Sequence, residues 1–259
     1  MTRVLSGAVL IVLAISAVWF APTWLFFAVA FGLGVLAAEE LFGLARASGI
    51  DVPLTASRVA TALVIGSSAL ADSLELFLMT ALVAVAASSL ASWRGGPTAL
   101  ASVSVSFLPA LYIGLPIAAM IGIRTMGGPP ALFLLMLTVI VSDTMQYYTG
   151  RALGRRALAP AVSPKKTIEG AAGGFVFGTA VFVIVGAWWV PSMPLPLRIA
   201  LGPTLVALGI AGDLFESMLK RSAGVKDSSA LIPGHGGVLD RIDALLFAAP
   251  VYYIVLKYV

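Results

Sequence analysis

Charged and hydroxyl side chains recur at helical spacing near the end of an otherwise apolar sequence. Asp213, Glu216, Ser217 and Lys220 fall at positions i, i+3, i+4 and i+7, which places them on one face of a helix. A carboxylate and a hydroxyl can bind a hard cation, and the ammonium group beside them can bind the anion that this cation bridges. The spacing therefore predicts a site for a metal ion and a phosphate.

A glycine-rich segment follows this face and contains the only histidine of the chain. It runs from Lys220 to Asp243 as KRSAGVKDSSALIPGHGGVLDRID. Glycine lets the backbone approach a ligand closely, and Asp240 and Asp243 share a face if a final helix has begun there. Oxygen ligands and the absence of cysteine favour Mg²⁺ or Mn²⁺ over zinc. For His235, three roles stay open: a metal ligand, a phosphate donor and a structural hydrogen-bonding group.

Two polar clusters precede this segment. Asp143 lies near the end of an apolar stretch, where an ionisable group indicates a functional site. A carboxylate that snorkels into an interfacial ion pair is the alternative. Further on, Ser163 is expected to cap a helix with Pro164 in its first turn, so that Lys165 and Lys166 flank the helix N-terminus. Because cations there oppose the helix dipole, a phosphate between them would stabilise this arrangement.

The composition indicates that membrane-spanning helices position these residues. Of 259 residues, 60% are hydrophobic and 11% are charged, whereas roughly a quarter are charged in soluble domains. The sequence predicts an all-α polytopic membrane protein that forms a single integral membrane domain over residues 1–259, with N-terminal helices in 1–125 and catalytic helices and cytoplasmic loops in 126–259. With about 20 apolar residues for each span, we expect about nine transmembrane helices near 4–20, 23–38, 56–71, 74–92, 99–123, 130–149, 171–190, 198–217 and 244–258.

Basic residues are distributed unevenly among the expected loops. With a cytoplasmic N-terminus, all of the 16 basic residues but three face the cytoplasm, as the positive-inside rule requires. The three exceptions are Arg124, Arg198 and Lys257. The first apolar run is expected to be a retained span and not a cleaved signal peptide. Glu39 and Glu40 are expected to be helix-end charges at the membrane interface.

Carboxylates beside clustered lysines and arginines are typical of phosphoryl or nucleotidyl transfer. No G-x-x-x-x-G-K-[ST] loop is present, which argues against a P-loop ATPase. The basic residues lie in separate loops rather than in one tract, which argues against binding to nucleic acid. A cation or proton transporter, with the intramembrane carboxylates as its ion path, is the alternative from another class. The crowding of lysines, arginines and glycines on one side favours an enzyme.

The segment from Ser217 to Asp243 resembles the 27-residue signature of phosphatidate cytidylyltransferases, also called CDP-diacylglycerol synthases. The matching positions are Ser217, Leu219-Lys220-Arg221, Lys226-Asp227 and the uninterrupted run from Ile232 to Asp243. Asp143-Thr144, Gly150-Arg151 and residues 163–170 resemble other blocks of the family. The similarity covers about the last 120 residues closely, and Gln146 departs from it where a small residue is expected.

The resemblance implies a multi-pass enzyme of the inner membrane that converts CTP and phosphatidic acid into CDP-diacylglycerol and pyrophosphate, in phospholipid biosynthesis. It also implies Mg²⁺, a homodimer and an additional monovalent cation. A CTP-dependent transferase acting on another lipid phosphate is the alternative. By this resemblance the catalytic residues are Asp143, Asp213, Lys220 and Asp240. The metal ligands are Asp213, Ser217, Asp240 and Asp243. The residues that bind substrate phosphates are Lys165, Lys166, Arg221, Lys226, His235 and Arg241.

Overall fold

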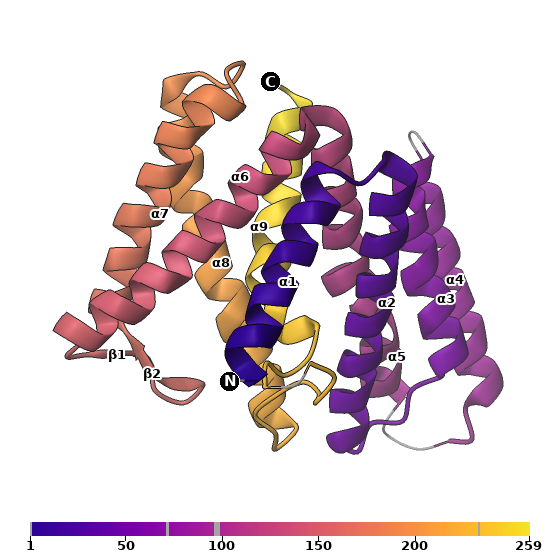
Figure 1. Cartoon of the computed structure of the whole chain (residues 1–259). Helices are drawn as coiled ribbons and strands as arrows, with labels where there is room; N and C mark the ends of the chain where they lie inside the picture. The colour runs from indigo at the N-terminus through magenta and orange to yellow at the C-terminus, as the bar shows by residue number, and fades with distance from the viewer. Residues whose placement is uncertain (1, 71–72, 96–98, 233) are drawn as a thin grey trace. The chain divides into compact units, whose positions relative to one another are not determined.

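The protein, described here by a computed structural model of residues 2–70, 73–95, 99–232 and 234–259, is built almost wholly of helices (Figure 1). Within this described part, five helical stretches are long and apolar enough to cross a membrane. These stretches are Thr23–Ala47, Leu74–Ser92, Ala99–Leu153, Ile168–Trp189 and Leu195–Ser222. The prediction of a helical membrane protein is confirmed at this level.

Contacts between residues divide the chain into two compact units. The first comprises Met1–Ala17, Ala21–Gly122 and Leu219–Arg241, and the second comprises Val18–Phe20, Ile123–Met218 and Ile242–Val259. The glycine-rich segment therefore packs with the N-terminal helices, although about a hundred residues separate them in the sequence.

The first unit gathers its early helices around α3. The elements are α1 (Thr2–Trp19), α2 (Thr23–Ala47), α3 (Leu54–Gly66), the 3-10 turn η1 (Ser67–Ala69), α4 (Leu74–Ser92), α5 (Ala99–Pro109) and the π-helical turn η2 (Ala110–Gly114). Helix α3 contacts α2, α4 and α5 (Figure 1). Their core contains Ala60, Val64, Ala81, Val85 and Ala110, all fully buried. Small side chains allow helices in a membrane to approach closely.

Helix α6 (Leu115–Leu153) changes direction within its apolar stretch. Gly128 has φ 71° and ψ −178°, which is a conformation that favours glycine, and Pro129 and Pro130 follow it. A proline cannot donate the backbone hydrogen bond of a continuing helix. This kink lies in the gap that the sequence predicts between one span ending near residue 123 and the next beginning near 130.

The second unit combines the later part of α6 with a hairpin and three helices. These elements are β1 (Ala157–Ala159), β2 (Ser163–Thr167), α7 (Ile168–Trp189), α8 (Leu195–Ser222) and α9 (Leu239–Lys257). The two strands pair antiparallel, and the hairpin joins the end of α6 to the start of α7 (Figure 1). The buried side chains of Ala171, Val206 and Ile210 form a core between α7 and α8.

Glycines on α7 bring that helix close to α6. A Cβ atom at Gly173 would collide with Thr149, and one at Gly174 would collide with Gln146 and Ser142. The backbone of α7 can therefore lie directly against these side chains, as small residues permit at helix interfaces in membranes. This packing fixes the turn of α6 that carries Asp143.

The prediction that Ser163 caps a helix containing Pro164 is wrong. Residues 163–167 form the strand β2, and helix α7 begins only at Ile168. Thr167 is the N-cap, and its hydroxyl oxygen accepts a hydrogen bond from the amide of Gly170 at 3.1 Å. Proline is tolerated in β2 because the sheet has only two strands, so each strand has an edge without a ladder partner.

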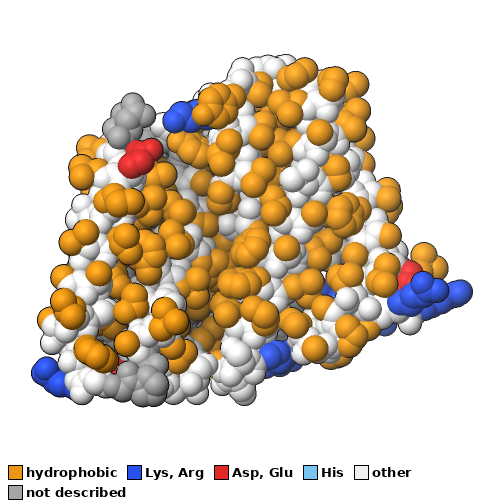
Figure 2. Space-filling model, turned by 180° about the vertical axis from the view of Figure 1, so that it is seen from behind, with side chains coloured by type: hydrophobic (Ala, Val, Ile, Leu, Met, Phe, Trp, Pro, Cys, Tyr) orange, Lys and Arg blue, Asp and Glu red, His pale blue; other side chains and the backbone are white. Residues whose placement is uncertain are grey.

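Hydrophobic side chains dominate the molecular surface. In Figure 2 they cover most of the visible face, and the charged side chains lie at its margins. On α4, only Ala81 and Val85 are buried, whereas Leu76, Val83 and Leu90 are largely exposed. An apolar surface of this extent is typical of helices that face lipid.

Candidate active site

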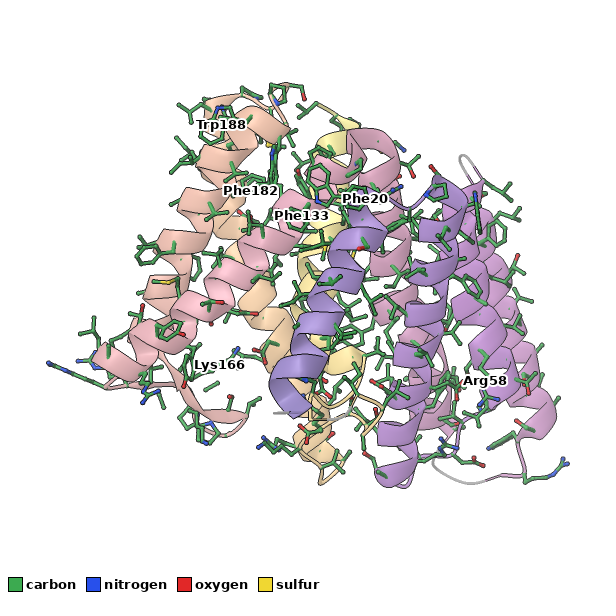
Figure 3. All side chains as sticks on the ribbon, viewed as in Figure 1. Phe20, Arg58, Phe133, Lys166, Phe182 and Trp188 are labelled. Carbon is green, nitrogen blue, oxygen red and sulfur yellow. The ribbon has the colours of Figure 1, made fainter. Side chains whose placement is uncertain are left out.

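A first polar cluster joins α8 to the hairpin. Helix α8 continues to Ser222, beyond its predicted end at 217, so Asp213 and Ser217 lie on one helix face as expected. The hydroxyl of Ser217 donates to Oδ1 of Asp213 at 3.3 Å, and the ammonium group of Lys166 donates to Oδ2. Figure 3 labels Lys166, which belongs to strand β2 of the hairpin. The Lys166 and Asp213 side chains are 22% and 26% exposed, so a substrate can reach this ion pair.

Asp143, on α6, belongs to the same cluster. Lys166 and Asp213 lie near enough for their charges to act on its carboxylate. Gln146 donates from Nε2 to Oδ1 of Asp143 at 2.9 Å and to the hydroxyl of Ser142 at 3.2 Å. The residue that departs from the family pattern therefore orients the carboxylate of Asp143. The structure brings together Asp143, Lys166 and Asp213, the outer two of which are 70 positions apart in the sequence.

A second polar cluster is centred on Asp240 at the start of α9. The ammonium group of Lys220 lies 2.5 Å from Oδ1 of Asp240, and their side chains are only 10% and 5% exposed. Oδ2 of Asp240 accepts hydrogen bonds from the amide of Ser228 at 3.0 Å, its hydroxyl at 2.7 Å and the amide of Gly237 at 2.8 Å. Asp240 thus holds the loop before α9 as well as the ammonium group at the end of α8.

These donors keep the carboxylate of Asp240, which precedes the predicted last span at 244–258, in its ionised form. Burial by itself raises the pKa of a carboxyl group, but the hydrogen bonds from Lys220, Gly237 and Ser228 outweigh it and lower the pKa of Asp240 to about 2. The site therefore contains a fixed negative charge at neutral pH.

The loop between α8 and α9 has the tight geometry that its glycines predict. Gly236 has φ 77°, and a Cβ atom there would crowd the carboxylate of Asp240. The amide of Ile232 donates to the carbonyl of Gly236 at 2.8 Å, and the amide of His235 donates back to Ile232 at 2.9 Å. The imidazole of His235 lies against Gly7 of α1. Pro233 lies outside the described residues.

The other predicted phosphate-binding residues lie near these clusters or in the neighbouring loops. Arg221 donates to the carbonyl of Val225 at 3.0 Å, beyond the end of α8. Three further cations, Lys165, Lys226 and Arg241, are exposed. Asp243, in the first turn of α9, accepts the amide of Ala244 at 2.7 Å. The exposed cations can bind a water-soluble anion without first breaking a buried ion pair.

Glu40 is the residue whose role the sequence did not indicate. It was expected to be an interfacial charge, but it is 7% exposed. Its carboxylate accepts hydrogen bonds from the hydroxyls of Ser228 and Ser229 and from the amides of Val238 and Leu239. The expectation of a helix-end charge at the membrane interface is therefore wrong for Glu40. All four donors lie almost 200 residues further along the chain, so no local pattern could reveal them.

The first cluster offers oxygen donors that fit a magnesium ion. Among the described residues, no three His, Asp or Glu side chains gather closely enough to enclose a metal. Mg²⁺ usually keeps several waters and binds through one or two carboxylates together with substrate phosphates. Asp213 and Ser217 present such a partial set, and the contact of Asp213 with Lys166 shows that this carboxylate already accommodates a cation.

Comparisons with known proteins match the sequence of this chain to a family and to curated relatives. The profile described as "Cytidylyltransferase family" matches residues 1–259. The chain is 45% identical over 127 residues to an uncharacterized protein of Escherichia coli K12, which covers 49% of this chain and 42% of that protein. It is 40% identical over 153 residues to a phosphatidate cytidylyltransferase of Bacillus subtilis, covering 58% and 56% of the two chains. A phosphatidate cytidylyltransferase of Haemophilus influenzae is 46% identical over 128 residues, covering 47% and 44%. These matches span about half the length of the curated relatives.

Proposed function

This chain belongs to the cytidylyltransferase family, and from that premise we propose that it is a phosphatidate cytidylyltransferase. It would convert CTP and phosphatidic acid into CDP-diacylglycerol and pyrophosphate. The observation that carries the proposal is the identity of 40% and 46% to two proteins of that name. The clustering of Asp143, Lys166 and Asp213 at the end of apolar helices supports it, because a lipid phosphate and a nucleotide could both reach such a site.

The proposed reaction is a substitution at phosphorus. A phosphate oxygen of phosphatidic acid forms a bond to the α-phosphorus of CTP. The bond from that phosphorus to the oxygen bridging the α- and β-phosphorus atoms breaks, and pyrophosphate leaves with that oxygen. The attacking oxygen is already anionic, so the protein needs no strong general base. The residues must align the two phosphates and neutralise their charge. The exposed lysines and arginines are suited to this task.

We assign the roles by charge. Lys165, Lys166, Lys220 and the exposed Lys226 and Arg241 would hold phosphate oxygens. Arg221 and His235, whose partners lie in the neighbouring loop and on α1, would support the same phosphates. Asp143 would orient the ammonium group of Lys166.

The metal assignment rests on donor chemistry. Asp213 and Ser217 would hold Mg²⁺ or Mn²⁺. The family resemblance implies Asp240 and Asp243 as further carboxylate ligands and a monovalent cation beside the divalent one. A divalent cation of this kind supplies charge neutralisation for the phosphates of CTP. The protein residues then fix where those phosphates lie.

We propose that the protein lies in the inner membrane as a homodimer with nine spans and a cytoplasmic N-terminus. Its active site would face the cytoplasm, because CTP is a cytoplasmic nucleotide. Since the chain has no cysteine, single cysteines at Ala161 and Ser192 can be labelled specifically. In intact cells an impermeant maleimide should label Ser192→Cys and spare Ala161→Cys. The reverse pattern would refute the orientation.

The enzyme assay is direct. Purified full-length protein in detergent is incubated with radiolabelled CTP, phosphatidic acid and Mg²⁺, and labelled lipid is extracted. Label in the lipid fraction that requires both phosphatidic acid and Mg²⁺ is the expected result. Label that appears only with a polyprenyl phosphate would favour the alternative lipid substrate, and no labelled lipid at all would refute the transferase.

A further inference from the structure

Glu40 binds one continuous part of the chain with both of its carboxylate oxygens. Oε1 accepts hydrogen bonds from the hydroxyl of Ser229 at 2.8 Å and the amide of Val238 at 2.9 Å. Oε2 accepts from the hydroxyl of Ser228 at 2.8 Å and the amide of Leu239 at 2.8 Å. We call this set, with Glu40 at its centre, the Glu40 tether. It links α2 to the loop that precedes α9.

Two of these donors lie at the start of α9. The first amides of a helix have no carbonyl partner within the helix, and a negative charge beside them is favourable. The carboxylate of Glu40 accepts the amides of Val238 and Leu239 there. Helix α9 is therefore capped by a residue from another helix rather than by its own preceding residue. Asp240 is the next residue after Leu239, so this cap also fixes its backbone.

The tether continues directly into the Asp240 cluster. The hydroxyl of Ser228 lies 2.8 Å from Oε2 of Glu40 and 2.7 Å from Oδ2 of Asp240. A Cβ atom at Gly237 would collide with both the Glu40 carboxylate and the Ser228 hydroxyl. This close approach requires glycine at that position. The Ser228 hydroxyl has a single hydrogen, which it can donate to one of these two carboxylates at a time, and it connects Glu40 and Asp240 in one network.

The neighbouring Glu39, on the same helix, forms an exposed ion pair and does not bind the described residues of the loop that precedes α9. Nε of Arg58 donates to Oε1 of Glu39 at 2.5 Å, and Nη2 donates to Oε2 at 2.7 Å. The side chain of Glu39 is 33% exposed and that of Arg58, labelled in Figure 3, is 49% exposed. Exposed ion pairs of this kind contribute little to stability. Glu39 therefore provides a matched control for Glu40.

We propose that Glu40 is a positioning residue for the transfer reaction: it holds the loop of residues 228–239 and the start of α9 so that Asp240 and Lys220 stand ready for substrate. This inference rests on the proposed function. Groups that orient active residues through hydrogen bonds reduce the reorganisation that a reaction requires. Removing such a group commonly lowers activity by about 10-fold to 100-fold.

The test compares Glu40→Gln with Glu39→Gln in full-length protein purified in detergent. The glutamine amide group would place a donor where the network needs an acceptor, whereas the Glu39 change affects only the exposed pair. Kinetics are measured well below each unfolding temperature, so that unfolded protein does not contribute. Glu40→Gln should lower kcat about 10-fold to 100-fold and change the KM for CTP by less than about 3-fold. Glu39→Gln should match the wild type.

Amide hydrogen exchange tests the Glu40 tether without requiring any catalytic activity. Without substrate, peptides covering Val238 and Leu239 should exchange at least about 10-fold faster in Glu40→Gln, and the middle of α9 should not change. If Glu40→Gln does not fold, Ser229→Ala can be used instead, because it removes a single donor. It should lower kcat and speed the exchange of Val238 and Leu239, each by a smaller factor.

The outcomes are distinct. Faster exchange with an unchanged kcat would reduce Glu40 to a structural role and overturn the positioning proposal. Unchanged exchange would show that the tether does not hold the loop, and it would overturn the proposal as well. A wild type without any transferase activity would refute the proposed function, and the role in that reaction with it, while the exchange arm would still report whether the tether exists.

Discussion

Replacing Asp240 by asparagine should destabilise the protein as well as inactivate it. The change removes the charge from a pair whose side chains are 10% and 5% exposed, so solvent screens it little. Removing one partner of a buried ion pair is destabilising by about 3 to 5 kcal/mol. The asparagine amide would also face donors from Ser228 and Gly237 if its nitrogen took the place of Oδ2. We expect a loss of about 3 kcal/mol or more.

A double-mutant cycle separates this structural effect from chemistry. At about 2 to 4 °C for each kcal/mol in a chain of this size, Asp240→Asn should lower the unfolding temperature in detergent by about 6 °C or more. Lys220→Met should have a similar effect. The double variant should be more stable than the sum of the two losses predicts, because it contains neither charge.

Activity is measured on the same three variants. If Asp240 contacts substrate or metal, the double variant recovers stability without recovering turnover. Strictly additive losses of stability would refute the buried-pair reasoning. A double variant with near-normal kcat would remove Asp240 from the catalytic residues and leave it a role in folding alone.

The remaining predictions separate solvent-accessible residues from buried ones. Asp213→Asn should leave the unfolding temperature within about 3 °C of the wild type, because the pair with Lys166 is partly exposed, but it should abolish most Mg²⁺-dependent turnover; normal turnover would exclude Asp213 from the site. The exposed Lys226, changed to alanine, should mainly raise the KM for CTP or lipid, and unchanged kinetics would leave it only a topological role. Because the pKa of Asp240 falls from 3.8 to about 2, its pair with Lys220 stabilises the fold above about pH 4 and weakens as the pH falls toward 2. The difference in unfolding temperature between the wild type and Asp240→Asn should therefore stay constant from about pH 8 to pH 5 and narrow below about pH 4, and a constant difference at all pH values would contradict this assignment.

Local rules of the chain predicted those parts of the fold that depend on neighbouring residues. Apolar stretches of sufficient length predicted the helices, and α6 is kinked at Gly128, in the gap between two of these predicted stretches. Helical spacing placed Asp213 and Ser217 on one face of α8. The same rules failed at Ser163, because a strand pairing outweighed the capping signal of serine followed by proline.

Contacts between distant segments could not be read in the same way. Lys166 and Asp213 meet through the packing of the hairpin and α8, which helical periodicity does not specify. Gln146 looked like a departure from the family pattern, and only the structure shows that it orients Asp143.

The sequence by itself determined the membrane class, the chemistry of the polar residues and the family resemblance, because composition, periodicity and a contiguous signature all lie along the chain. The tertiary structure decided which of these residues meet. Glu39 and Glu40 are adjacent carboxylates on one helix, yet one forms an exposed ion pair and the other is buried against four donors from residues 228–239. That difference arises because successive residues of a helix point in different directions, and only the packed fold decides what each direction meets.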